Sequence, residues 1–192
     1  MTVPGVSLMT AATFIAAVGD IRRFHEPGKL VGYLGLDPKV RQSGIGAARH
    51  GRISKQGASQ VRQMLTEAAF VAVSTPGPMR AFYERVRARR GSQIAIVAVA
   101  RKLAVLFWHL LTREQDYAYQ RPSLTRKKLR ALELRAGAQR HPGSRTLATK
   151  NAYSQRAHRE RERELSEQAE TAYRRLVADW TATAPTRSPA TT

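Results

Sequence analysis

The chain contains no cysteine in 192 residues, and acidic residues are scarce, 14 against 33 Lys and Arg. The absence of cysteine excludes disulfides and thiolate metal sites, and it agrees with a reducing cytoplasm. Aromatic residues make up only 7% of the chain and no signal peptide is recognisable, which argues against binding to an anionic membrane surface. With a net charge of +19 and a pI near 11.4, the expected partner is a polyanion, and nucleic acid is the first choice.

Two further kinds of site are missing from the sequence. No glycine-rich nucleotide-binding loop of the Walker or Rossmann type is present. The histidines are scattered and form no pair at ligand spacing, and no paired carboxylates stand out near the glycine-rich loop described below. The sequence therefore predicts no metal site in this chain.

The longest apolar run, Ile94 to Leu111, is about as long as a bilayer-spanning helix. Arg101 and Lys102 interrupt it near the middle, where each charge would cost several kcal/mol in lipid, about 2.5–3.5 on insertion scales. We therefore expect a buried helix of a globular core and no membrane segment.

Apolar spacing predicts a mainly α fold. We expect a compact helical domain over residues 1–117, which begins like a helix-hairpin-helix module and contains an irregular loop or short β-hairpin. A basic linker with a short helix should follow over residues 118–150, then a long charged helix over 151–182 and a disordered tail over 183–192. The first helix is expected to follow the Pro4-Gly5 loop and to end at about Val18. The other helices are expected near Pro27–Leu34, Ala58–Val73, Met79–Arg89, Ser92–Arg113 (capped by Ser92), Ser123–Arg135 and Asn151–Thr181, and the strands at Val40–Ser43 and Gly51–Ser54.

The long charged helix carries an apolar stripe, which is usually a packing or coiled-coil face. Its members are Leu165, Ala169, Tyr173, Leu176 and Trp180.

The turn at Pro4-Gly5 precedes the first predicted helix. In helix-hairpin-helix modules such a turn exposes backbone N–H groups that hold a DNA phosphate. Here Ser7 stands in place of the second glycine of that turn. Gly5 and Ser7 are therefore candidate phosphate-binding residues, and the alternative is a plain turn followed by a packing helix.

The segment Gly35–Leu65 places Ser43 in a glycine-broken loop among arginines. Glycine lets the backbone approach a ligand closely, and guanidinium groups fork onto phosphate oxygens. A serine hydroxyl is a weak nucleophile unless a base or a cationic field assists it, and His50 is the nearest candidate base. The alternative is that Ser43-Gly44 is an ordinary turn. The candidate phosphate-binding residues of this segment are Arg41, Arg49, Arg52 and Lys55.

Two residues that follow the loop have open roles. Ser54 is the reserve candidate for the nucleophile, and Ser54-Lys55-Gln56-Gly57 reads equally well as the entry to a helix. Arg62, one turn into that helix, either faces the same ligand or is a solvated surface charge.

These residues form an ordered set of short motifs that resembles the C-terminal half of the IS110/IS116/IS902 family of insertion-sequence transposases. The resemblance runs in register from about residue 3 to Tyr117. Its motifs are Pro4-Gly5, Gly19-Asp20-Ile21-x-Arg23-Phe24, Gly35-Leu36-x-Pro38, Gln42-Ser43-Gly44, Gly51-x-Ile53-Ser54-Lys55-x-Gly57 and Ala98-Val99-Ala100-Arg101-Lys102-Leu103.

The resemblance implies a DNA recombinase that excises and inserts a mobile element. Members of the family pair a RuvC-like, acidic, metal-binding N-terminal domain with a helical C-terminal domain that bears an essential serine. They use a structured guide RNA and assemble as oligomers with composite active sites. By position Ser43 matches the serine expected to attack the scissile phosphodiester, with Ser54 in reserve.

The chain begins at the Pro4-Gly5 turn, so we expect it to lack the RuvC-like domain, and with it the Mg²⁺ site that would assist phosphoryl transfer. We therefore expect a truncated or split transposase, or an isolated domain, without autonomous strand transfer. The expected partners are DNA, a guide RNA and further copies of the chain, in the cytoplasm of a bacterium near its nucleoid. The alternative function is a non-catalytic nucleic-acid-binding or oligomerisation module.

Overall fold

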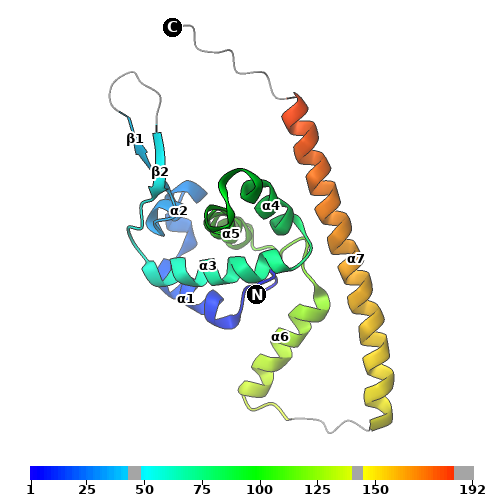
Figure 1. The fold of residues 1–192 in the computed structure, drawn as a ribbon. Helices are drawn as coiled ribbons and strands as arrows, with labels where there is room; N and C mark the ends of the chain where they lie inside the picture. The colour runs from blue at the N-terminus through cyan, green and yellow to red at the C-terminus, as the bar shows by residue number, and fades with distance from the viewer. Residues whose placement is uncertain (43–48, 140–144, 184–192) are drawn as a thin grey trace.

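The computed structural model describes residues 1–42, 49–139 and 145–183. Within them the fold is mainly α, as predicted, with one small antiparallel sheet (Figure 1). The elements in chain order are α1 (Leu8–Val18), the 3₁₀ helix η1 (Ile21–Arg23), α2 (Pro27–Tyr33), β1 (Pro38–Arg41), β2 (Arg49–Ile53), α3 (Ser59–Ser74), α4 (Pro78–Arg90), α5 (Ser92–Arg113), α6 (Pro122–Arg135) and α7 (Arg145–Thr183).

Helix α5 is the centre of the core, and α2, α3 and α4 pack around it. Its buried residues recur every three or four positions, so that one broad side of the helix is apolar. They are Ala95, Ile96, Val99, Ala100, Leu103, Ala104 and Phe107. By length and composition α5 could cross a membrane, but these residues are buried against neighbouring helices of the same chain, as the sequence predicts for a core helix.

The N-terminal segment closes one side of this core. Ser7 caps α1 by accepting a hydrogen bond from the Thr10 amide, which satisfies one of the N–H groups left open at a helix start. Phe14 then packs edge-to-face on Phe107 of α5, with ring centroids 5.0 Å apart. The Trp108 indole donates to the Phe24 carbonyl oxygen at 2.8 Å, so the end of η1 is also fixed to α5.

Helices α6 and α7 lie outside this core. Figure 1 shows α7 running along the side of the helical domain, with α6 converging on it from below the core. Helix α7 contacts α4, and α6 contacts α7. The long helix is therefore docked on the domain over its middle part.

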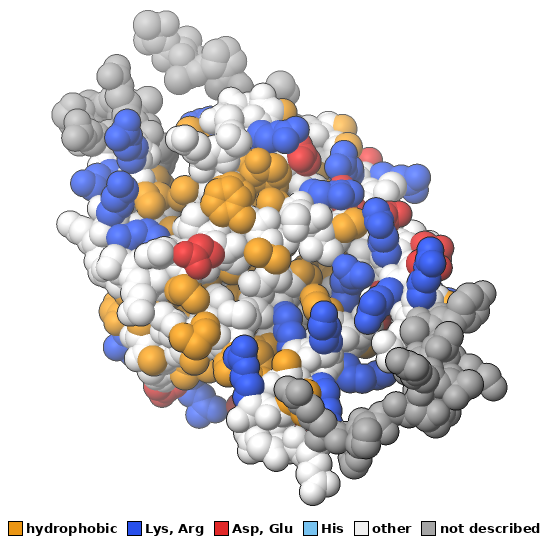
Figure 2. Space-filling model, turned by 60° about the horizontal axis from the view of Figure 1, so that its bottom comes forward, with side chains coloured by type: hydrophobic (Ala, Val, Ile, Leu, Met, Phe, Trp, Pro, Cys, Tyr) orange, Lys and Arg blue, Asp and Glu red, His pale blue; other side chains and the backbone are white. Residues whose placement is uncertain are grey.

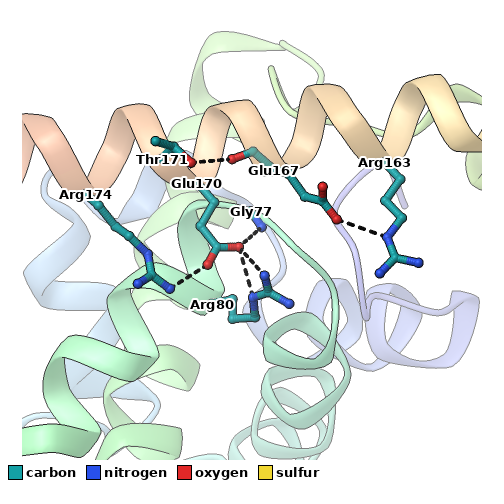
Figure 3. A network of polar contacts seen from close by, with 7 residues as sticks. All are labelled: Gly77, Arg80, Arg163, Glu167, Glu170, Thr171 and Arg174. Atoms are coloured by element: carbon teal, nitrogen blue, oxygen red, sulfur yellow. Dashed lines mark hydrogen bonds and ion pairs between the residues drawn. The ribbon is translucent and has the colours of Figure 1, made fainter.

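Glu170 makes this docking specific. The residue is 4% exposed, and its carboxylate accepts hydrogen bonds from the Gly77 amide, from Arg80 and from Arg174 at 2.7–3.0 Å (Figure 3). Lys102 of α5 adds a hydrogen bond to the Tyr173 hydroxyl at 3.1 Å. A buried carboxylate is stable here because every donor around it is aimed at its oxygens.

Several local expectations are corrected. Ser92 is not a cap: it is the first residue of α5, and Gly91 holds the cap position without a side-chain hydrogen bond. Helix α7 begins at Arg145 rather than Asn151, so residues 145–150 are helical and not part of the predicted linker.

The expected stripe on the long helix packs against the domain only in part. Tyr173 and Ala169 are half-buried, whereas Leu165, Leu176 and Trp180 are exposed. The side of α7 that contacts α4 is centred on the buried Glu170, so the stripe lies at the edge of the contact rather than in its middle.

Candidate nucleic-acid interface

The β1–β2 hairpin extends from the helical domain between α2 and α3 (Figure 1). Its strands are antiparallel, and the register pairs Arg41 with Arg49 and Val40 with His50. The strands are offset from the predicted ranges, since β1 ends at Arg41 and β2 begins at Arg49. The paired Arg41 and Arg49 are therefore the last residue of β1 and the first residue of β2.

Ser43, the leading candidate nucleophile, lies in the connection between these strands and outside the described residues. The side chains of Arg41, Arg49 and His50 also lie outside the described part. What the structure establishes is where the described strands end: Arg41 pairs with Arg49 at the end of the hairpin that lies away from the helical core (Figure 1).

The base of the hairpin is closed by Ser54, the reserve nucleophile. Its amide donates to the Asp37 carbonyl oxygen at 2.8 Å, and its hydroxyl donates to Asp37 Oδ1 at 2.6 Å. The next amide, of Lys55, donates to the Gly35 carbonyl oxygen at 3.1 Å. These bonds extend the pairing beyond the end of β2. The Ser54 hydroxyl thus has a carboxylate partner whose role the sequence alone did not indicate, because only the strand register brings Asp37 beside it.

Two glycines at this base allow the backbone to pack closely against neighbouring backbone. Gly35 and Gly57 have φ of +66° and +86°, a region that residues with a Cβ adopt at a cost of about 1–2 kcal/mol. A Cβ on Gly57 would overlap the Tyr33 carbonyl oxygen at the end of α2, and one on Gly35 would overlap the Gln56 backbone. Backbone therefore meets backbone on both sides of the hairpin base.

Arg62 serves this junction as well. Its guanidinium donates from Nη1 to the Leu34 carbonyl oxygen at 3.0 Å, which satisfies an acceptor at the C-terminal end of α2 and ties α3 to it. Arg62 is half-buried. Of the two readings offered by the sequence, neither included this internal bond.

The exposed cations of the hairpin are Lys39, Arg52 and Lys55. The backbone of Lys55 is in the left-handed region, with φ of +58°. Lys39, on β1, was missed by the sequence reasoning, although its position two residues before Arg41 was a visible signal. Among the described side chains these three carry the positive charge of the hairpin.

The turn at Pro4-Gly5 is packed rather than open. Gly5 has φ of +82°, and a Cβ there would overlap the Ala68 carbonyl oxygen of α3. On the carbonyl side of the turn, the Lys128 ammonium of α6 donates to the Met1, Val3 and Val6 oxygens at 2.8–3.3 Å. Burial lowers the pKa of this lysine. Gly5 thus has a packing role and Ser7 a capping role, and their proposed contacts with phosphate stay predictions.

The described residues contain no group of three or more His, Asp or Glu that could hold a metal ion. The Mg²⁺ implied by the family resemblance therefore has no fitting ligand set in this part of the chain, and we assign it no residue and no step here.

The hairpin lies in the part of the chain that is similar to a known protein family. Residues 1–84, from the N-terminus to the middle of α4, match the model of the Transposase IS116/IS110/IS902 family. The match includes the hairpin and both glycines of its base. It stops before α5, whereas the motifs quoted above extend into that helix.

Individual relatives extend the likeness. The chain is 34% identical over 120 residues to the transposase for insertion sequence element IS1111A of Coxiella burnetii, an alignment that covers 60% of this chain and 33% of that protein. It is 32% identical over 122 residues to a probable family 20 transposase of Pseudomonas aeruginosa, covering 61% and 36%. A putative transposase of Sinorhizobium fredii is 35% identical over 130 residues, covering 54% and 33%. The chain thus spans about a third of the length of each relative.

Proposed function

We propose, from the match of residues 1–84 to the model of the Transposase IS116/IS110/IS902 family, that this chain is the DNA-handling, serine-bearing domain of an insertion-sequence transposase. In this proposal the β1–β2 hairpin presents Ser43 to a scissile phosphodiester. The observation that supports it most is the hairpin itself. Its residues lie within the segment that matches the family model, its base is fixed by backbone contacts, and its two strands end at the paired Arg41 and Arg49.

The rigid base supports the chemistry. A nucleophile is effective when it is held near the attacked atom, because positioning removes much of the entropic barrier. The bonds from Ser54 and Lys55 to Asp37 and Gly35, together with the glycine contacts, fix the direction of the hairpin relative to α2 and α3. Cations near the reacting phosphate would offset the charge that develops during attack.

The proposed step is a transesterification. The Ser43 oxygen forms a bond to phosphorus while the bond from phosphorus to the leaving sugar oxygen breaks. The serine proton passes to a base and the leaving oxygen takes up a proton, so that a protein–DNA phosphodiester replaces the original one. Ser54 is the reserve for this role, and its hydrogen bond to Asp37 would in that case orient it.

The test uses a full-length relative that carries both serines, because this chain spans about a third of such proteins. The variants are alanine at the serine aligned with Ser43 and, separately, at that aligned with Ser54. Nicked DNA substrates trap the covalent adduct, which is read on a denaturing gel. We expect loss of the adduct with the first variant, unchanged DNA binding, and an adduct that persists with the second.

Two results would overturn the assignment. An adduct that survives loss of the Ser43-equivalent serine and disappears with the Ser54-equivalent one transfers the role to Ser54. Survival of the adduct in the double variant removes serine chemistry altogether and leaves a non-catalytic nucleic-acid-binding module.

The proposed partners rest on the net positive charge of the chain and on its similarity to the transposase family. DNA is the proposed substrate and a structured RNA a proposed second ligand, both attracted by the net charge of +19. Assembly into oligomers and a cytoplasmic, nucleoid-associated location are proposed on the same family basis. Sizing of the purified chain with and without DNA tests assembly, which monomeric behaviour in both samples would contradict.

A further inference from the structure

Helices α6 and α7 enclose a basic groove that lies outside the residues matched by the family model. The groove has a volume of about 700 Å³. Four cationic side chains and one carboxylate line it: Arg126, Lys127 and Arg130 from α6, and Arg159 and Glu162 from α7. In Figure 2, Lys and Arg side chains gather on the right-hand part of the face, where α7 lies in Figure 1.

The single carboxylate of the groove is already engaged. Glu162 accepts hydrogen bonds from the Ser123 amide, at 2.8 Å, and from the Ser123 hydroxyl. It therefore caps the start of α6 and offsets little of the charge farther along the groove. Arg126, Lys127 and Arg159 have no hydrogen bond or ion pair with any residue that the structure describes. An anionic ligand would relieve the repulsion among them.

Both walls of the groove are fixed. Lys128 anchors α6 to three carbonyl oxygens of the N-terminal turn. Glu170 anchors α7 to Gly77 and Arg80 (Figure 3). The cations of the two walls thus face a preformed space, so that binding does not have to order the helices first.

The shape of the groove fits a chain rather than a single ion. Its α6 residues run from Pro122 to Leu134, about 18 Å along the axis at 1.5 Å per residue. Arg126 and Arg130 follow one another at one helical turn, about 6 Å along that axis. Ala131 and Leu134 of the α6 wall are apolar. His158 of α7 is the one aromatic ring among the described lining residues, so stacking could involve one base at most and recognition would rest mainly on the backbone of the ligand.

We propose that the α6–α7 groove binds the phosphodiester backbone of a nucleic-acid strand, independently of base sequence. This contact goes beyond the serine hairpin: it lies on other elements and involves no covalent step. Its effect would be to hold a strand of the bound nucleic acid at a second point on the protein.

The test compares double variants of the full chain that each lower the net charge by two. The groove variant is Arg126→Gln with Arg159→Gln, one cation from each wall. The matched control is Arg135→Gln with Arg161→Gln, on the same helices, exposed and outside the groove. A third variant, Arg52→Gln with Lys55→Gln, removes two hairpin cations. Circular dichroism confirms that all of them retain the wild-type helix content.

Binding is measured by fluorescence anisotropy with labelled 20-nucleotide DNA and RNA strands of one sequence, over a series of salt concentrations. Each lost phosphate contact lowers the salt slope by about 0.7 on a single strand. Two lost contacts should therefore reduce the slope by about 1.4 and weaken binding about tenfold near 0.15 M salt. The control should stay within twofold of wild type. A loss confined to RNA or to DNA would identify which of them the groove takes.

The proposal is overturned if the groove variant and the control weaken binding equally, or if polyglutamate binding falls as much as nucleic-acid binding. The hairpin variant separates this outcome from the proposed function. If only the hairpin variant weakens binding, the groove proposal fails and the hairpin proposal stands. If only the groove variant weakens binding, the groove proposal stands and the hairpin proposal fails.

Discussion

Glu170 should control whether α7 stays docked on the helical domain, and Glu170→Gln is the perturbation that tests this. The substitution keeps the shape of the side chain and removes its charge. The carboxylate accepts from the Gly77 amide, from Arg80 and from Arg174. Breaking a buried ion pair costs about 3–5 kcal/mol. The Arg80 and Arg174 side chains are 35% and 57% exposed, so water compensates part of the loss and we expect about 2 kcal/mol.

A loss of about 2 kcal/mol changes the docking equilibrium of α7 by about 30-fold. Among the described residues α7 contacts the core mainly through α4, with side chains such as Lys102 adding to this contact, so the effect should be local. Amide hydrogen exchange followed by mass spectrometry should show faster exchange in α7 and unchanged exchange in α5.

The matched control is Glu167→Gln, one turn earlier on the same helix (Figure 3). Glu167 pairs with Arg163 at 3.0 Å, and both side chains are about half exposed or more, so the change should cost less than about 0.5 kcal/mol. Equal exchange in Glu170→Gln and wild type, or an equally large effect of Glu167→Gln, would refute the reasoning.

Three further predictions concern other contacts. Gly57→Ala and Gly91→Ala both place a Cβ at positive φ, +86° and +82°, which costs about 1–3 kcal/mol in backbone strain. Only at Gly57 would the Cβ also overlap the Tyr33 carbonyl oxygen, so Gly57→Ala should cost about 1–3 kcal/mol more than Gly91→Ala; equal losses in urea unfolding would contradict this. Lys128→Met should cost about 1–3 kcal/mol by leaving carbonyl oxygens unpaired, measured by thermal unfolding with the exposed Lys127→Met as control; no difference between the two variants would contradict it. Burial, and to a lesser degree the charge of Tyr119, raises the pKa of Tyr117 to about 12 from 10.0. The contribution of Tyr117 to stability is therefore complete below pH 10 and is lost as pH rises toward 12. A Tyr117→Phe variant should lack this alkaline loss, and identical curves of stability against pH in both proteins would disprove the assignment.

Acid should also release α7. Burial alone would raise the pKa of Glu170, but the Gly77 amide, Arg174 and Arg80 together outweigh it and hold the pKa below 4.5. The contribution of Glu170 to stability is therefore complete above pH 4.5 and is lost as pH falls through the lower folded value. In exchange experiments on acidified samples, wild-type α7 should approach the behaviour of Glu170→Gln. A constant difference between the two proteins down to pH 3 would contradict this.

The helices were predictable because their signals are local. Pro27 and Pro78 stand at the first turns of α2 and α4, where proline is tolerated, and the buried positions of α5 recur at helical spacing. Ile15 shows the limit of such patterns. It belongs to the apolar face of α1 but is 55% exposed, because packing against α3 and α5 uses only the side of the helix that contains Phe14 and Val18.

The site was predictable in its residue types and less so in its partners. The glycines and cations between Gly35 and Gly57 indicated a ligand-handling loop, and the family match covers them. The bond from Ser54 to Asp37 and that from Arg62 to Leu34 depend on register and helix placement, which no local pattern encodes. The groove between α6 and α7 was missed for the same reason: its cations meet only after two helices separated by a linker come together.

The backbone contacts of Gly35 and Gly57 make the hairpin between them an exchangeable cassette. Its base is closed largely by main-chain atoms, which every sequence possesses. Few side chains would have to be kept in a graft: the Ser54–Asp37 pair and an apolar residue at Ile53, which packs against the core. Residues 38–53 from another member of the family could therefore be transplanted between the two glycines without redesigning α2 or α3. Chimeras of this kind would test whether the proposed DNA-handling specificity belongs to the hairpin or to the helical domain that carries it.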